Sequence, residues 1–114
     1  MTENGTAAAQ RFARFNARPE IRRITSRYAD WVAQGDGCMI NTQLSTLAML
    51  RMGRRISRSD YRASVRKLAS ASGLPPKDFQ LLAECSRELV RCALSGSGQV
   101  AFTPGDWASE EEGL

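Results

Sequence analysis

Apolar side chains in this chain recur every three or four residues, the spacing that gathers them on one face of an α-helix. Proline is favoured in the first turn of a helix, so Pro19 marks the start of one such segment. The glycines of Gly35-Asp36-Gly37 predict its end. The apolar positions between these limits are Ile21, Ile24, Tyr28, Trp31 and Val32. The sequence therefore predicts an all-α fold, a small bundle of four to five helices with a flexible acidic C-terminal tail.

Capping and breaking residues predict three further helices, at about residues 41–52, 57–72 and 77–95. Ser57 precedes an acidic residue by three positions, as in a capping box, which satisfies free N–H groups in the first turn of a helix. Gly73 is a natural left-handed end for that helix, and two prolines then open the last one. These breaks divide the chain into segments of ordinary helix length.

A chain of 114 residues has the size of one domain. We expect residues 18–96 to form a helical domain. Residues 1–17 are rich in helix-forming alanine and predict a short helix or an N-terminal arm. Residues 97–114 contain three consecutive glutamates near their end and predict a C-terminal tail, which stays mobile unless its aromatic residues dock.

The residue types needed for common catalytic and metal sites are missing or dispersed. Histidine is absent, which removes the usual general base near neutral pH and the commonest metal ligand. Cys85 and Cys92 are seven residues apart, roughly 10 Å along a helix, which is too far for a disulfide. The carboxylates are scattered. We therefore expect no enzyme activity, no catalytic or metal-binding residues and no cofactor.

The sequence also indicates where the protein works. The longest uncharged apolar runs are far shorter than the roughly 20 residues of a membrane span. The first residues lack the apolar core of a signal peptide. An odd number of cysteines without a regular spacing suggests a reducing compartment. These features predict a cytoplasmic protein without a membrane partner.

Charge is unevenly distributed and leaves two kinds of macromolecular partner open. Residues 11–67 contain thirteen Arg and Lys against four acids, whereas residues 68–114 contain three against seven. A basic half can contact nucleic acid or an acidic protein surface. The stretch KLASASGLPPKDFQLL has the spacing of a helix-turn-helix pair, so a small DNA-binding regulator is the alternative function. Asp78 and Glu84 on its second helix would oppose phosphate, and we do not favour direct nucleic-acid binding.

The predicted helices contain more apolar surface than one small domain can cover. The helix at about 41–52 is apolar around most of its circumference, and the helix at 77–95 has a broad stripe that includes Leu89. A helix apolar on all sides must be buried on all sides, so we expect an interface with a second copy or a protein partner. Each residue of this predicted interface can equally belong to the core. The predicted contact residues are Leu44, Leu47, Met49, Leu50 and Met52, with Trp31 and Phe15.

The stretch RPEIRRITSRYADWVAQGDGCMINTQLSTLAMLRMGRRIS, together with GQVAFTPGDWASEEEGL at the C-terminus, resembles the small quorum-sensing anti-activators. The resemblance covers most of the chain and implies a helical protein, and the excess of apolar surface leads us to expect a homodimer. It also implies a partner, the ligand-binding domain of a LuxR-type transcription factor such as LasR. Such an anti-activator covers the surface through which that domain dimerises, so the regulator no longer holds its two DNA half-sites. The resemblance assigns no individual contact residue.

Overall fold

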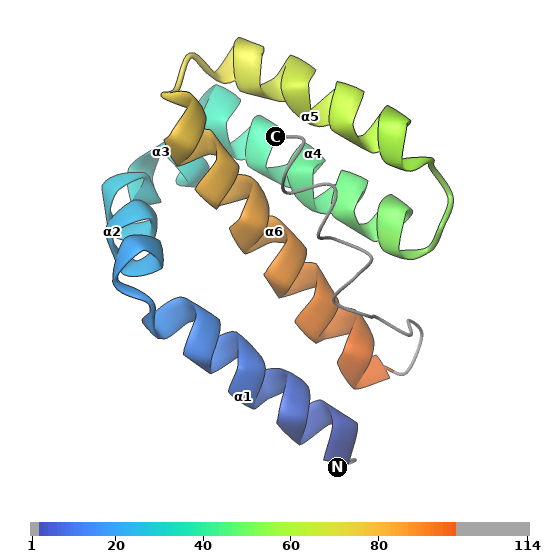
Figure 1. Cartoon of the computed structure of the whole chain (residues 1–114). Helices are drawn as coiled ribbons and strands as arrows, with labels where there is room; N and C mark the ends of the chain where they lie inside the picture. Colours follow the sequence, from blue (N-terminus) through green and yellow to red (C-terminus); the bar gives the residue numbers. More distant parts are fainter. Residues whose placement is uncertain (1–2, 98–114) are drawn as a thin grey trace.

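The computed structural model describes residues 3–97, which contain six α-helices and no strand (Figure 1). This confirms the predicted all-α fold. Residues 98–114, which make up most of the predicted tail, lie outside the described part of the chain. The helices are α1 (Glu3–Ala17), α2 (Pro19–Arg27), α3 (Ala29–Ala33), α4 (Gly35–Met52), α5 (Arg58–Ser72) and α6 (Pro76–Ser97).

Helix α6 occupies the centre of the bundle, with α1 on one side and α4 and α5 on the other (Figure 1). It also contacts α2. Its apolar stripe is broad enough to be covered from several directions, as expected of a central helix. Its residues meet those of α4 and α5 in the main core cluster, which consists of Ile40, Leu44, Tyr61, Val65, Phe79 and Ala83.

The beginning of α4 differs from the prediction. This helix was expected from about residue 41 but begins at Gly35, directly after the short helix α3. Gly35 has a φ of +65°, which a residue with a side chain rarely adopts. A Cβ on Gly37 would lie 2.6 Å from Cδ2 of Trp31 and closer still to the Trp31 carbonyl oxygen. The two glycines therefore let α3 and α4 approach closely, and Gly37 lies inside the helix it was expected to precede.

The predicted caps of α5 are confirmed. The Ser57 hydroxyl accepts a hydrogen bond of 3.1 Å from the backbone N–H of Asp60, which satisfies one free donor of the first turn. Gly73 ends the helix with a φ of +69° in the left-handed region. Leu74 then packs against the main core cluster, so the chain turns sharply into α6.

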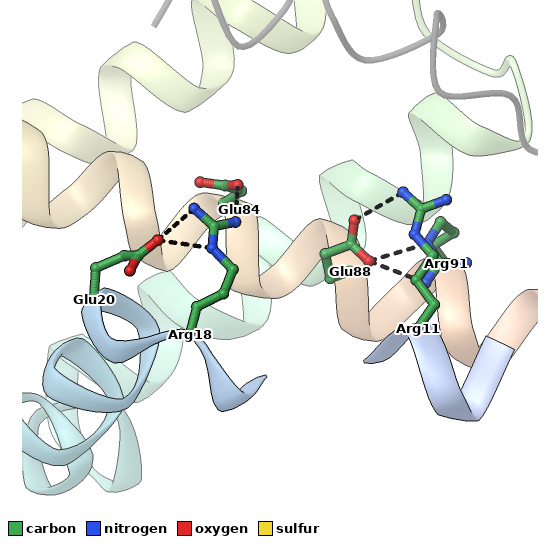
Figure 2. Close-up of polar contacts among 6 residues, drawn as sticks. All are labelled: Arg11, Arg18, Glu20, Glu84, Glu88 and Arg91. Atoms are coloured by element: carbon green, nitrogen blue, oxygen red, sulfur yellow. Dashed lines mark hydrogen bonds and ion pairs between the residues drawn. The ribbon is translucent and has the colours of Figure 1, made fainter. Parts of the chain in front are cut away.

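The N-terminal segment forms a helix that is held along α6. Phe15 is buried between α1 and the rest of the bundle. On the outer side, Nη2 of Arg11 lies 3.3 Å from Oε1 of Glu88, and Nη1 of Arg18 lies 3.4 Å from Oε1 of Glu84 (Figure 2). Burial of Phe15 and the Arg11–Glu88 ion pair thus attach α1 to the bundle, and the Arg18–Glu84 pair holds the residue between α1 and α2 to the central helix.

Candidate protein-binding site

The structure places the seven predicted contact residues at different depths. Leu44 and Phe15 are buried, with 2% and 8% of their surfaces exposed. Leu50 is half-buried, and Met49 is 49% exposed. The remaining three are half-buried and pack against the main core cluster, namely Trp31, Leu47 and Met52. Met49 is therefore the predicted residue best placed to reach a second molecule.

An open pocket of about 170 Å³ lies where α2, α3, α4 and α6 meet, and we call it the α4/α6 pocket. The side of α4 contributes Asn41 and Ser45, and α6 contributes four residues over two turns. Because these positions are three or four residues apart, they share a face of each helix. The complete lining is Thr25, Tyr28, Val32, Asn41, Ser45, Leu82, Cys85, Ser86 and Leu89.

Exposed apolar side chains lie beside this pocket. Leu89, one of the lining residues, is 50% exposed. Met49 follows Ser45 by one helical turn, so it lies on nearly the same side of α4. We call Leu89 and Met49 the apolar rim. A third exposed apolar residue, Met39, is 60% exposed and lies about 15 Å from Met49 along the helix axis.

Leu89 was not singled out from the sequence, because it was assigned to the inward stripe of its helix. That stripe spans positions that face α4, α5 and open solvent, and spacing alone does not distinguish among them. Leu89 differs from its neighbour Val90, which is 6% exposed, by a rotation of about 100° around the helix. The packing of α6 against its neighbours decides that Leu89 is exposed and Val90 is buried.

Hydrogen bonds fix the α2 side of the pocket. The Tyr28 hydroxyl donates to Oδ2 of Asp78 over 2.5 Å, and this bond raises the pKa of Tyr28 above its ordinary value. The Thr25 hydroxyl donates to the Ile21 carbonyl oxygen over 3.0 Å. Tyr28 also meets the Trp31 ring edge to face, with ring centroids 6.2 Å apart. The hydroxyl groups of Thr25 and Tyr28 are thus already hydrogen-bonded within the protein. The apolar parts of both side chains line the pocket.

The surroundings of Cys85 in the pocket wall disfavour its thiolate form. Burial, followed by the negative charge of Glu84, raises the pKa of Cys85 to about 11. A thiol with this pKa stays protonated at neutral pH, and the protonated form is a poor nucleophile. Within residues 3–97, no three His, Cys, Asp or Glu side chains gather closely enough to hold a metal ion. The pocket therefore presents mainly apolar surface to solvent.

Two arginines of α6 face inward, which the sequence did not indicate. Arg87 and Arg91 are 3% and 5% exposed. Nε of Arg91 donates to Oε2 of Glu88 over 3.1 Å, and Arg11 reaches the other oxygen of the same carboxylate (Figure 2). Nη1 of Arg87 donates to the Tyr61 hydroxyl over 3.4 Å. A pairing of Glu88 with Arg91 three residues later was the available signal.

Helix α6 is the second helix of the predicted helix-turn-helix pair, the one that would read DNA. A recognition helix must present one whole face to the major groove of DNA. Helix α6 instead contacts α1, α2, α4 and α5. Among the described helices, none is long and apolar enough to span a lipid bilayer.

Comparisons of the chain with family models, curated proteins and solved structures find no match.

Proposed function

We propose that this protein is a quorum-sensing anti-activator of the kind represented by QslA. It binds the ligand-binding domain of a LuxR-type transcription factor such as LasR, in the cytoplasm, and covers the surface through which that domain dimerises. The observation that carries the proposal is the apolar rim, where Leu89 and Met49 stand about half exposed beside an open pocket. The sequence resemblance described above points to the same partner.

The rim has the composition of the centre of a protein interface. Such centres contain a few apolar anchors surrounded by polar residues, and most of the binding energy comes from those anchors. Leu89 and Met49 each have about half of their surface left to bury, which stabilises a complex by about 1 kcal/mol per side chain. Asn41 and Ser45 supply the polar surroundings. A partner side chain in the pocket adds further buried area.

This mode of inhibition needs no catalytic group. A dimeric helix-turn-helix regulator binds DNA through two half-sites, and its affinity falls steeply when one contact is lost. An inhibitor that occupies the dimer surface in a stoichiometric complex is therefore sufficient. Self-association is part of the proposal: Met39, exposed and distant from the rim, offers a separate apolar contact for a homodimer.

The decisive experiment measures the oligomeric state of the purified LasR ligand-binding domain by sedimentation velocity, with and without this protein. We expect the domain's homodimer to be replaced by a mixed complex. Leu89→Arg and Met49→Arg should prevent that replacement, because a charge cannot be buried there without a partner. The matched control is Ala63→Arg, an exposed position on α5, which should bind like the unaltered protein.

Circular dichroism of each variant separates loss of binding from loss of fold. Unchanged binding by both rim variants would place the site elsewhere on the protein. Failure of the unaltered protein to form any complex at micromolar concentrations would remove the proposed function. Binding to duplex DNA that weakens steeply with rising salt would instead favour the DNA-binding alternative.

A further inference from the structure

The outer face of α4 has the spacing of a helix that pairs with another helix. Ile40 and Leu44 face the main core cluster, and Thr46 follows Leu44 by a rotation of about 200°, so it points away from the bundle. On this outer face, exposed positions recur at alternating intervals of four and three residues, as in the contact line of a two-helix coiled coil. We call these positions the α4 seam: Gly35, Met39, Thr42, Thr46, Met49 and Gly53.

The α4 seam is exposed and lies in an uncharged stretch of the chain. Residues 37–50 contain no charged side chain, whereas 25% of the whole chain is charged. Helix surfaces that face water usually carry charges, and the centres of protein interfaces are depleted in charge and enriched in methionine. Met39 and Met49 are the two largest side chains of the seam, and they are 60% and 49% exposed. This composition indicates a face that a second polypeptide covers.

The order of residues in the seam shows which polypeptide fits it. The order Gly-Met-Thr-Thr-Met-Gly is symmetric about Leu44, from which Met39 and Met49 are each five residues distant. In a two-fold symmetric dimer the same patch serves both copies, so residue i of one copy contacts residue j of the other, and the reverse. If two α4 helices lie antiparallel with their midpoints opposite, each Met39 meets Met49 of the other copy, and the threonines meet between them. The seam is therefore complementary to a second copy of itself.

The charges at the ends of α4 favour the same arrangement. Asp36 lies in the first turn and Arg51 in the last, and the exposed Arg55 follows the helix. An antiparallel pair places the acidic beginning of each helix beside the basic end of the other. A parallel pair would place like charges together at both ends, which is unfavourable.

From these observations we infer that two copies of this chain associate through the α4 seam, antiparallel and two-fold symmetric about Leu44, with Met39 of each copy packed against Met49 of the other. This interface rests on the self-association included in the proposed function and identifies the surface that mediates it. Met49 belongs to both the α4 seam and the apolar rim, so the two surfaces share one residue, and Met39 reports on the seam alone.

The direct test uses the unaltered protein, labelled with carbon-13 at the methionine methyl groups. Met39 and Met49 lie about 15 Å apart along the helix, too far for a nuclear Overhauser effect between their methyl groups within one copy. Such an effect arises only between two copies that pair antiparallel, and we expect to observe it. Its absence, or a monomer in sedimentation equilibrium at the same protein concentration, would overturn the inference.

Charge variants test the pairing by sedimentation equilibrium. Met39→Glu should weaken self-association about 100-fold, about tenfold for each of the two identical contacts, because the new charge is buried without a partner. The double variant Met39→Glu/Met49→Arg should recover most of this loss, because antiparallel pairing brings opposite charges together in both contacts. A parallel pair would bring like charges together and give no recovery. The matched control Ala63→Glu, at an exposed position on α5, should associate like the unaltered protein.

Circular dichroism of each variant verifies that it is folded. Unchanged self-association of Met39→Glu, or no recovery in the double variant, would each contradict the antiparallel seam. Both experiments omit LasR, so their failure would remove this interface and leave the proposed partner to the sedimentation experiment described above.

Discussion

Glu88 and Glu84 provide a matched pair for testing how charge stabilises the bundle. They are four residues apart on α6: Glu88 pairs with Arg11 of α1, and Glu84 pairs with Arg18, which lies between α1 and α2 (Figure 2). Glu88 also contacts Arg91, whose side chain is 5% exposed. The partner of Glu84 is Arg18, whose side chain is 46% exposed. The two carboxylates thus differ mainly in their arginine partners: Glu88 forms an ion pair with a buried guanidinium, and Glu84 does not.

Replacing Glu88 by glutamine keeps the size of the side chain and removes its charge. A hydrogen bond to a charged group contributes about 1 kcal/mol more than a neutral one, and the loss is larger when the remaining charge is buried. The Arg91 contact should therefore account for about 1.5 kcal/mol and the more exposed Arg11 contact for about 0.5 kcal/mol, since Arg11 has 38% of its side chain exposed. We expect Glu88→Gln to lower the free energy of unfolding by about 2 kcal/mol.

The control Glu84→Gln should cost no more than about 0.5 kcal/mol, because exposed ion pairs contribute little. Urea unfolding followed by circular dichroism measures both values. The midpoint of Glu88→Gln should fall by about 1–2 M urea, given the slopes usual for small domains. Equal losses in the two variants, or a negligible loss for Glu88→Gln, would refute the view that the buried Arg91 depends on this carboxylate.

Three further predictions concern the backbone and the pH dependence. Gly37→Ala should destabilise the protein by about 2 kcal/mol in thermal unfolding, because the new Cβ overlaps the Trp31 backbone. The control Gly53→Ala should change stability little, because the nearest atom to its Cβ would be 3.4 Å away. Ser57→Ala should cost about 1 kcal/mol and Ser57→Asp should not, since aspartate also caps a helix; equal losses would contradict the cap. The pKa of Cys85, raised to about 11, means that the folded state favours the protonated thiol. The free energy of unfolding should therefore be constant near neutral pH and fall by about 2 kcal/mol between pH 9 and 11. The fall should be smaller in Cys85→Ala. A decline of the same size in that variant would assign the effect to other groups.

The sequence predicted correctly those features of the helices that depend on residues close together along the chain. The cap at Ser57 and the left-handed end at Gly73 depend on a few positions along the chain, and both were found where expected. The helical spacing also predicted the all-α fold. Gly37 was misplaced because its role depends on Trp31, which packs against it from another helix.

The candidate site was predicted less well because exposure depends on which helices pack together. Met49 and Leu44 lie on one apolar helix, and the sequence gives no means of separating the exposed residue from the buried one. Leu89 was expected to face inward for the same reason. The inward position of Arg87 could not be anticipated, since its partner Tyr61 is 26 residues away on α5.

The central position of α6 has a consequence for biosynthesis. Among the helices of residues 3–97 it is the last in chain order, yet α1, α2, α4 and α5 all pack against it (Figure 1). While a ribosome is still translating α6, α4 and α5 can already pack against each other, but the faces of α1, α2 and α4 that contact α6 stay uncovered and accessible to chaperones and proteases. We therefore expect nascent chains to become resistant to proteases only after α6 has left the ribosome.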